Sequence, residues 1–368
     1  MDQKRHTIKT VPVAYFVSPH GYGHAARAAA VMESLTRAAS GKAEFHIYTK
    51  VPRWFFRDSV SGPFHYHPVL TDIGLVQQTP LQADLQETVN RLDRFLPVDV
   101  NKVEALARQI VRAGCRMVVC DIAPLGIQVA RTAGIPSVLV ENFTWDWLYG
   151  PYERLAPRMA PHIRYLKGLF RASDFHIQTE PVCRRQPVDL VTRPVSRKAR
   201  MPAGEVRRRL DLPERASVVL ITMGGIASVL PFLERLREVK GVRFLIPGGA
   251  KTIKHQGNLV LLPHHSQYFH PDLLAASDAV VGKVGYSTLA ETYWAGIPFG
   301  FIARRSFRES GKLVSFIREH LAGLAIREEG FHAGTWISRL PELLSLPRIR
   351  RHDPNGADEV ARFLIGLF

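Results

Sequence analysis

The feature that most restricts the fold of this chain is an alternation of short apolar runs with longer stretches of helical periodicity. In the first half, apolar runs of strand length lie at 13–18, 44–49, 117–122 and 137–142. The stretches between them fit helices, including one long helix expected over 84–113. Strands joined by helices form right-handed crossovers, so this half is predicted to contain a parallel sheet covered by helices.

The alternation begins again after residues 184–204, which are rich in Pro and Arg without a sustained period and are typical of a linker. Beyond this segment, strands are expected at 217–225, 242–249, 259–263, 279–282 and 298–303, with helices at 228–239, 270–276 and 286–295. A chain of 368 residues is also long enough for two hydrophobic cores. We therefore predict an α/β protein with two Rossmann-like, doubly wound domains facing a cleft. Their expected bounds are 1–190 and 205–350, with a helix in 351–368 that closes on the body of the protein.

The net charge of the chain indicates the sign of charge expected on its binding partners. A net charge of +16, from 49 Lys and Arg against 33 Asp and Glu, favours anions such as nucleoside diphosphates or acidic lipids. Basic clusters such as 197-RKAR and 207-RRR lack the interleaved aromatic residues of a nucleic-acid platform. We predict no nucleic-acid partner, and we interpret the clusters as a solvated surface. Weak attachment to an anionic membrane is the alternative.

Compartment and redox state follow from what the sequence contains. Apolar runs are far shorter than the about 20 residues of a membrane-spanning helix, and no cleavable leader is recognised at the N-terminus. A cytoplasmic protein is expected, with peripheral attachment at the inner face of the membrane left open. The chain has three cysteines, an odd number without metal-ligand spacing, and they are expected to be buried free thiols: Cys115, Cys120 and Cys183.

The first motif with chemical potential is 18-SPHGYGHAAR, where a strand ends and a helix begins. Gly21 and Gly23 permit a tight turn, and the helix start offers N–H groups to an anion or an acceptor hydroxyl. His24 lies in the first turn, where the helix dipole favours the neutral imidazole that a general base needs, and His20 is a second candidate. A structural histidine is the alternative. The glycine spacing matches neither a dinucleotide-binding loop nor a phosphate-binding loop with Gly-Lys-Ser/Thr, so neither NAD nor ATP is predicted.

The second motif is 282-GKVGYSTLAETYWAGIP, again at the start of a helix that follows a strand. Its Ser287 or Thr288 can cap the helix, whose N–H groups can bind a diphosphate. Glu291, one turn further, is expected on an exposed side facing the cleft, where its carboxylate can accept hydrogen bonds from both ribose hydroxyls. An ordinary capped helix with a surface glutamate explains the same residues.

With these two motifs, the sequence resembles the GT-B glycosyltransferases. The pattern G-x-x-G-x-x-T-x-x-E followed by A-G-x-P is similar to the donor-nucleotide site of the peptidoglycan N-acetylglucosaminyltransferases. Three stretches resemble still more closely the glycosyltransferase-like N-terminal domain of plant arabinokinases and its bacterial relatives. They are HGYGHAAR, 120-CDIAPLGIQVARTAGIPSVLVENFTWDWLY, and 282-GKVGYSTLAE with 304-RRSFRE, within a resemblance that spans about residues 12–340.

The resemblance implies a nucleotide-sugar donor, with a UDP-sugar as the first choice, held by the C-terminal half, and an acceptor held by the N-terminal half. His24 falls at the position of the histidine that activates the acceptor, and Glu291 at the position of the ribose-binding carboxylate. The implied donor site comprises Gly224, Gly225, His264, Lys283, Gly285, Ser287, Thr288, Glu291 and Glu309. The paired amides of the peptidoglycan enzymes are absent from the last loop, so their sugar specificity does not carry over. The resemblance to the plant proteins covers their glycosyltransferase-like domain and not their kinase, so their cellular role does not carry over either.

The remaining candidates are residues that follow strands in the first half. Asp121 is a second catalytic candidate that could orient His24 or contact the acceptor, although a helix cap is the commoner role for such an aspartate. Asn142, Trp145 and Asp146 combine an aromatic ring with polar groups suited to a sugar face, and with the loop residues His20, Gly21 and Gly23 they form the expected acceptor set. Core packing explains the tryptophan equally well. No metal-ligand spacing is apparent, so neither a metal nor another cofactor is expected to be required.

The sequence thus predicts a metal-independent glycosyltransferase of the hexosyltransferase type. His24 would deprotonate a hydroxyl of an unidentified acceptor, which attacks the anomeric carbon while the nucleoside diphosphate departs. A nucleotide-sugar 2-epimerase and a noncatalytic nucleotide-sugar-binding module stay open as alternatives.

Overall fold

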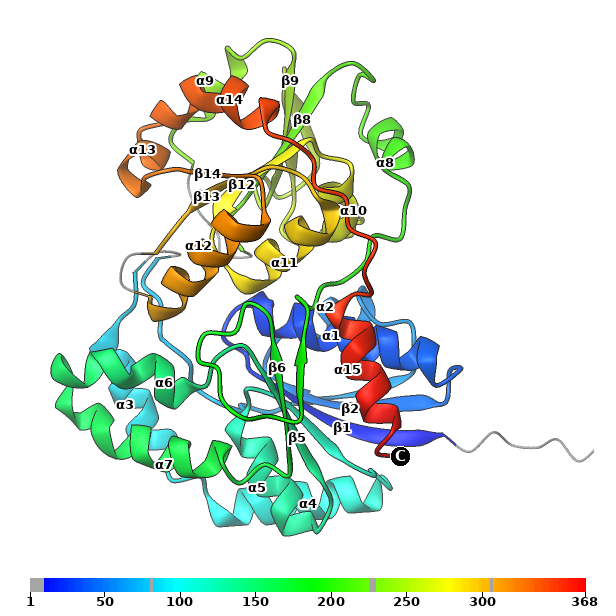
Figure 1. The fold of residues 1–368 in the computed structure, drawn as a ribbon, viewed down its shortest axis with the longest axis vertical. Coiled ribbons are helices and arrows are strands. Elements are labelled where there is room, and N and C mark those ends of the chain that lie inside the picture. The colour runs from blue at the N-terminus through cyan, green and yellow to red at the C-terminus, as the bar shows by residue number, and fades with distance from the viewer. Residues whose placement is uncertain (1–9, 80–81, 225–229, 305–306) are drawn as a thin grey trace, which may run out of the picture.

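A computed structural model describes residues 10–79, 82–224, 230–304 and 307–368, and the structural statements below concern these residues. They form two domains, one above the other in Figure 1, each built around a sheet of seven described strands. The first sheet consists of β1 Val11–Val17, β2 Ala43–Thr49, β3 Phe64–Pro68, β4 Val118–Asp121, β5 Ser137–Glu141, β6 Phe175–Thr179 and β7 Leu190–Thr192. The second consists of β8 Ser217–Thr222, β9 Val242–Pro247, β10 Lys254–Gln256, β11 Leu259–Leu262, β12 Ala279–Lys283, β13 Phe299–Ile302 and β14 Gly323–Ala325.

Both sheets have doubly wound topology. The strand orders are β3-β2-β1-β4-β5-β6-β7 and β10-β11-β9-β8-β12-β13-β14. Every pairing between these strands is parallel except that of β10 with β11. In each sheet the strand order reverses beside the first strand of the domain, β1 or β8. Loops that follow the strands diverge at this point, which is where ligands bind in open parallel sheets. The predicted fold class is confirmed.

Helices cover both faces of each sheet. The first domain contains α1 Tyr22–Ala38, α2 Arg53–Arg57, α3 Leu85–Phe95, α4 Val100–Arg112, α5 Pro124–Ala133, α6 Trp145–Tyr149 and α7 Ala160–Phe170, with short 3₁₀ helices at Gly150–Arg154 and Pro157–Met159. The chain from the second domain onward forms α8 Ala203–Arg209, α9 Leu233–Arg237, α10 His270–Ala275, α11 Tyr286–Ala295, α12 Arg308–His320, α13 Glu328–His332, α14 Leu340–Ser345 and α15 Gly356–Ile365, with a 3₁₀ helix at Thr335–Arg339.

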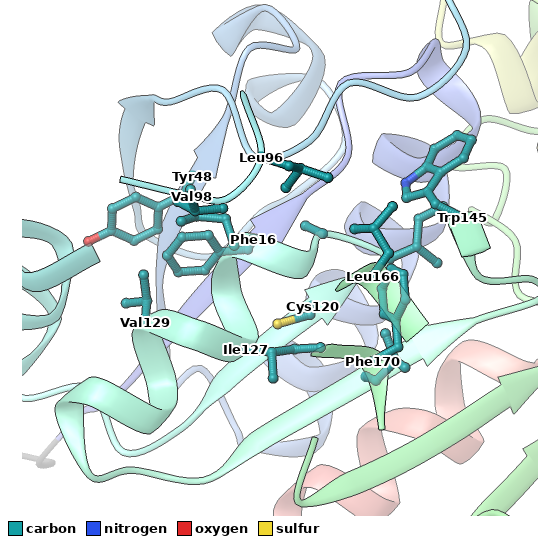
Figure 2. Packing of buried hydrophobic residues seen from close by; sticks show 14 of the residues in the cluster. Phe16, Tyr48, Leu96, Val98, Cys120, Ile127, Val129, Trp145, Leu166 and Phe170 are labelled. Carbon is teal, nitrogen blue, oxygen red and sulfur yellow. The ribbon is translucent and has the colours of Figure 1, made fainter. Parts of the chain in front are cut away.

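The core of the first domain lies on both faces of its sheet. On one face, side chains of the strands pack against α4, α5 and α7, as Figure 2 shows for Phe16, Cys120, Ile127 and Phe170. On the other face, they pack against α1, α2 and α15. The three cysteines are buried free thiols, as predicted. Burial raises the pKa of the Cys115 thiol to about 12, so this thiol is unreactive near neutral pH.

Two local predictions were wrong. The long helix expected over 84–113 is two helices, α3 and α4, because Pro97 lacks the N–H that a continuous helix needs and Asp99 caps α4 by accepting a bond from the amide of Asn101. The expected linker contains β7, which extends the first sheet to Thr192, beyond the expected bound at 190. The expected helix over 228–239 is α9 within the described residues, and positions 228 and 229 lie outside them.

The last helix crosses back to the first domain. The chain leaves α14 of the second domain, and α15 then packs on α1, as the red and blue helices show in Figure 1. Val360, Ala361 and Leu364 of α15 are fully buried there. Asp358 accepts hydrogen bonds from the Ser34 hydroxyl at 2.8 Å and from Lys198 at 2.7 Å. The helix expected in 351–368 therefore closes on the domain farther from it in sequence.

Candidate active site

A cavity of about 1080 Å³ lies between the domains, at the carboxyl ends of the two sheets. It is lined from the first domain by Tyr22, Trp54, Phe55 and Ser59, and from the second by Thr222, Gly224, His264, His270, Ser287, Thr288 and Glu291. A second cavity of about 70 Å³ has four of its lining residues in common with the larger one: Tyr22, Gly224, Ser287 and Thr288. The smaller cavity also contains His20, Gly21, Gly23, His24, Lys283, Gly285 and Glu309, so most of the sequence-predicted site residues line one of these two spaces.

The starts of two helices approach each other at this point. Gly21, the N-cap of α1, has φ 72°, a left-handed conformation that suits glycine. Gly23 in the first turn lies so close to α11 that a Cβ there would be 3.8 Å from the Ser287 hydroxyl oxygen. Both helix N-termini therefore face the space between the domains, where they favour an anion.

His24 belongs to a buried cluster of charged groups. Its Nδ1 lies 3.1 Å from Oδ1 of Asp121, at the end of β4. Arg27, one turn further along α1, donates to both oxygens of Asp121 at 2.8 and 2.7 Å. Burial by itself raises the pKa of Asp121, but the Arg27 guanidinium and the His24 hydrogen bond hold that pKa below its usual value. Asp121 is thus a fixed anion that orients the imidazole.

The backbone beside Asp121 is strained. Ile122 follows it with φ 40°, in the left-handed region that a β-branched residue rarely adopts, and is fully buried. Such strain persists where the surroundings fix a functional geometry. Asp121 is also tied to the neighbouring strand, since its carbonyl accepts a bond of 3.2 Å from the amide of Ser18.

Asn142 joins this cluster to the second domain. Its Oδ1 accepts a hydrogen bond of 2.7 Å from Arg27, and its Nδ2 donates one of 2.8 Å to Oε1 of Glu309. Arg304 Nη2 is 3.7 Å from the other Glu309 oxygen. A continuous polar chain therefore runs from His24 to the loop after β13, and Asn142 links the domains.

Lys283, at the end of β12, is a buried cation in the smaller cavity. Burial, and then repulsion from Arg304, lower its pKa to about 7. Gly224 faces it with φ 73°, and a Cβ there would lie 3.4 Å from the Lys283 Cε. Burial likewise lowers the pKa of Arg304 to about 10. This arrangement can accept an anion beside the start of α11.

Glu291 is buried, in contrast to its expected exposed position. Only 4 % of the residue is exposed, because α10 and the segment between the domains cover it. Its Oε1 accepts a hydrogen bond from Arg197 at 2.9 Å and its Oε2 lies 2.9 Å from Nδ1 of His270. Burial by itself raises the Glu291 pKa, but these two partners hold it below its usual value. Glu291 still lines the large cavity, so it can reach a ligand there as a carboxylate.

Arg197 was missed as a site residue, since the cluster 197-RKAR was interpreted as solvated surface. Its guanidinium lies 4.9 Å from the ring centre of Phe55 and 5.0 Å from that of Phe269. The side chain is 9 % exposed, and it joins Glu291 to aromatic rings of both domains. No local pattern distinguishes it from its basic neighbours, because all of its partners are distant in sequence.

Asp72 was missed as well. It follows β3, accepts hydrogen bonds from the Ser18 hydroxyl at 3.0 Å and from Trp145 Nε1 at 3.1 Å, and burial raises its pKa to about 7. Trp145 packs in the core beside His20 and His24 and lines neither cavity. Trp145 therefore acts by positioning Asp72, His20 and His24. Asp72 lies in the loop four residues beyond β3, a strand that was not predicted, and nothing in the sequence placed it beside Trp145.

The other predicted residues are placed as follows. Asp146 is buried in the first turn of α6 and lines neither cavity. His264 reaches across the large cavity, with Nε2 3.1 Å from the Tyr22 hydroxyl. Gly225 lies outside the described residues. Among described residues, the one group of three with metal-ligand proximity is Glu44, His46 and His65 on β2 and β3, and none of the three lines either cavity.

Comparisons with known proteins agree with this architecture. No family model matches the chain. The sequence is 28 % identical over 369 residues to an L-arabinokinase of Arabidopsis thaliana, with 97 % of this chain and 34 % of that protein covered. The chain thus spans about a third of the plant protein. It is 23 % identical over 293 residues to an uncharacterized glycosyltransferase of Methanopyrus kandleri, covering 72 % of this chain and 79 % of that protein.

A shorter match, 32 % identical over 117 residues, is to the UDP-N-acetylglucosamine–N-acetylmuramyl-(pentapeptide) pyrophosphoryl-undecaprenol N-acetylglucosamine transferase of Desulforudis audaxviator, covering 26 % of this chain and 30 % of that protein. Among solved structures, a glycosyltransferase of kitacinnamycin superposes with a TM-score of 0.62 at 16 % identity, covering 98 % of this chain and 99 % of that one. MurG of Acinetobacter baumannii superposes with a TM-score of 0.56 at 13 % identity, covering 97 % and 99 %. As the sequence resemblance implied, the chain has the GT-B fold of the glycosyltransferases.

Proposed function

We propose that this protein transfers a sugar from a nucleoside-diphosphate sugar, with UDP as the first choice of nucleotide, to a hydroxyl group of an acceptor. The observation that carries the proposal is the His24–Asp121 pair, 3.1 Å apart, beside the start of α11 and the cavity that Glu291 lines. A base and an anion-binding helix N-terminus then lie on opposite sides of one space. That is the arrangement needed to activate an acceptor and stabilise a leaving diphosphate.

The proposed chemistry uses His24 as the base. When Nδ1–H of His24 donates to Asp121, Nε2 retains the lone pair that takes the proton of the acceptor hydroxyl. The acceptor oxygen then bonds to the anomeric carbon, and the bond from that carbon to the diphosphate oxygen breaks. The nucleoside diphosphate leaves with the electron pair, and its charge is stabilised by Lys283, Arg304 and the N–H groups at the start of α11.

We place the proposed ligands in the two cavities. The nucleotide would occupy the larger cavity, with its ribose at Glu291 and its base near His264, and the diphosphate would lie beside Gly224 and Lys283. The acceptor would enter over His20 and the α1 loop. All charges that this chemistry needs come from side chains and helix ends, so we propose that turnover does not depend on an added metal ion.

The first experiment is a binding screen followed by turnover. Stabilisation of the folded protein against heat by one nucleoside diphosphate identifies the donor nucleotide, since a ligand that binds the native state raises the melting temperature. The matching nucleotide sugars are then incubated with candidate acceptors, with and without a chelator. Conversion of the sugar without an acceptor would indicate an epimerase, and binding without any conversion would indicate a noncatalytic module.

Replacing His24 tests the catalytic role. We expect His24→Ala to lower turnover by about 100-fold or more while donor binding, measured by calorimetry, stays nearly unchanged. His255→Ala is the matched control, because His255 is an exposed histidine on β10. Near-normal turnover in His24→Ala would transfer the role of base to another group, with Asp121 the next candidate.

A further inference from the structure

The large cavity has an aromatic wall that belongs to the first domain, formed by Tyr22 of α1 with Trp54 and Phe55 of α2. α2 lies on the side of the first domain that faces the second (Figure 1). The rings of Tyr22 and Phe55 are stacked with centres 5.1 Å apart, and the Trp54 ring meets that of Tyr22 at 5.8 Å. Phe56, the third aromatic residue of α2, is fully buried in the core and anchors the helix. The aromatic wall is therefore held in place by the fold of the first domain.

The aromatic wall contacts the second domain directly. The Trp54 ring stacks on the His265 ring, with centres 4.2 Å apart and planes 18° apart. His265 Nε2 also lies 2.8 Å from the carboxylate of Asp58, which follows α2. The Tyr22 hydroxyl is 3.1 Å from Nε2 of His264. All five of these residues line the large cavity, so one side of it is built from rings and polar groups of both domains.

The residues that line the two cavities give the direction of an elongated ligand. Ser287 and Thr288, at the start of α11, line both cavities, whereas Phe55 lines only the large one. Glu291, one turn further along α11, is paired with Arg197, whose guanidinium lies 4.9 Å from the centre of the Phe55 ring. A nucleotide with its diphosphate at the start of α11 and its ribose at Glu291 therefore extends its base towards the aromatic wall.

The chemistry of the aromatic wall suits a nucleobase. A base is flat, uncharged and aromatic, and every base has a face that stacks on an aromatic side chain. The phosphates need cations and helix N-termini instead, and these lie in the smaller cavity, at Lys283 and the start of α11. Trp54 is half-buried at the edge of the core, whereas Phe55 is only 5 % exposed. Trp54 is therefore the member of the wall whose replacement disturbs the core least.

We propose that the first domain takes part in binding the donor nucleotide, with Trp54 packing against the nucleobase and the loop of His264 and His265 enclosing the base from the second domain. This inference rests on the proposed function. It departs from the division implied by the sequence resemblance, in which the C-terminal half holds the donor and the N-terminal half holds the acceptor. Because the base contacts both domains, the bound donor holds them together around the reacting groups.

Calorimetric titration of the full chain with UDP, ADP, GDP and TDP tests this contact. For the nucleotide that binds the native protein most tightly, we expect Trp54→Ala to weaken binding about 10-fold or more, because a stacking partner of the base is lost. Trp54→Leu keeps an apolar side chain without an aromatic face and should bind as weakly, whereas Trp54→Phe should keep most of the affinity. Phe368→Ala, which removes an exposed aromatic residue outside both cavities, should bind as the native protein does. Circular dichroism checks that each variant folds.

Tryptophan fluorescence separates contact with the base from an indirect effect on the fold. A base stacked on the indole quenches its emission, so the nucleotide should quench the native protein and Phe368→Ala, and Trp54→Phe much less.

The outcomes distinguish this inference from the proposed function. Equal affinity of the native protein and Trp54→Ala for the nucleotide, or equal quenching in the native protein and Trp54→Phe, would overturn the role of Trp54 and leave a donor site in the second domain. If the native protein binds none of the four nucleotides, the proposed function fails, and this inference fails with it.

Discussion

Buried charged side chains are concentrated around the interdomain space. Arg27 and Asp121 are less than 2 % exposed, and Lys283, Glu291 and Arg304 are each less than a tenth exposed. A buried charge is costly unless it is paired, and Asp121 and Glu291 each have an arginine partner. Lys283 and Arg304 have Glu309 as their nearby carboxylate, and it also accepts a bond from Asn142. Two cations thus share one carboxylate at this position, and an anionic ligand would neutralise the excess of positive charge.

Donor binding should therefore depend on pH through Lys283, whose pKa in the free protein is about 7. A diphosphate binds the protonated lysine more strongly than the neutral one. Binding therefore raises the pKa of Lys283, and the protein takes up a proton. We expect affinity for a nucleoside-diphosphate sugar to be highest below pH 7 and to fall as the pH rises from 7 towards 9. Calorimetry at several pH values, in buffers of different ionisation heat, measures both affinity and proton uptake.

The variant Lys283→Met serves as the comparison for this pH profile. It should bind the same ligand more weakly at pH 6 and show a flat profile from pH 6 to 9. A slope that persists in the variant would assign the titration to another group, and Asp72, with a pKa of about 7, would be the first to examine.

Glu291 should contribute to stability as well as to binding, contrary to the expectation from sequence. Glu291→Ala would leave the Arg197 guanidinium, with a side chain only 9 % exposed, and the half-buried His270 without their common partner. We expect the free energy of unfolding, measured in urea, to fall by about 3 kcal/mol. Glu342→Ala is the control, because Glu342 forms an exposed ion pair with Arg339, and its loss should leave the free energy of unfolding nearly unchanged.

Glu291→Gln tests the ribose contact without removing the side-chain volume. It should weaken binding of the ribonucleotide about 10-fold, whereas the 2′-deoxynucleotide should bind the native protein weakly and lose little more. Equal affinity of native protein and variant for the ribonucleotide would contradict the assignment of Glu291 to the donor site.

At the scale of the elements, the sequence predicted what depends on local pattern. Buried parallel strands are continuous apolar runs, so β12 and the helix that follows it were found, with α11 at its expected 286–295. β7 was missed because three residues beside Pro and Arg carry no pattern of their own and gain their strand structure from β6. The break between α3 and α4 could have been inferred from Pro97.

The candidate site likewise combines residues that a local pattern predicts with residues that only the fold brings together. The glycines and His24 belong to a helix start, which is a local signal, and Arg27 shares the helix face of His24 three residues later. Arg197 meets Glu291 across 94 residues of sequence, and Asp72 meets Trp145 across 73. Contacts between residues so far apart in the sequence form only when the strands have paired in their final order. The pattern of a single sequence therefore does not predict them.

The contribution of α15 to stability can be tested directly. Leu364 is fully buried against the first domain, so Leu364→Ala should lower the free energy of unfolding by about 2–4 kcal/mol. Phe368→Ala, at a residue that is 38 % exposed, should change it little. Deletion of 356–368 should lower the melting temperature and the solubility, because it uncovers α1; an unchanged melting temperature would show that α15 is dispensable.

At the scale of the whole molecule, the net charge of +16 is the main clue to partners beyond the proposed donor. In the described ranges, no helix has both the length and the apolar character needed to cross a membrane. We expect weak binding to vesicles that contain acidic lipids at about 0.02 M salt, lost at about 0.5 M salt as screening increases. Cosedimentation measures this, with neutral vesicles as the control. No binding even at low salt would argue for an acceptor in solution.

The path of α15 has a consequence for how the protein is made. A ribosome produces the chain from its N-terminus, so β1 to β7 are available for folding long before the helix that covers α1 has been synthesised. Until then the first domain carries an apolar stripe on α1, which is a site for chaperone binding or aggregation. Completion of the first domain thus awaits synthesis of the second. A circular permutant with α15 placed ahead of β1 would remove that delay and let the first domain mature by itself.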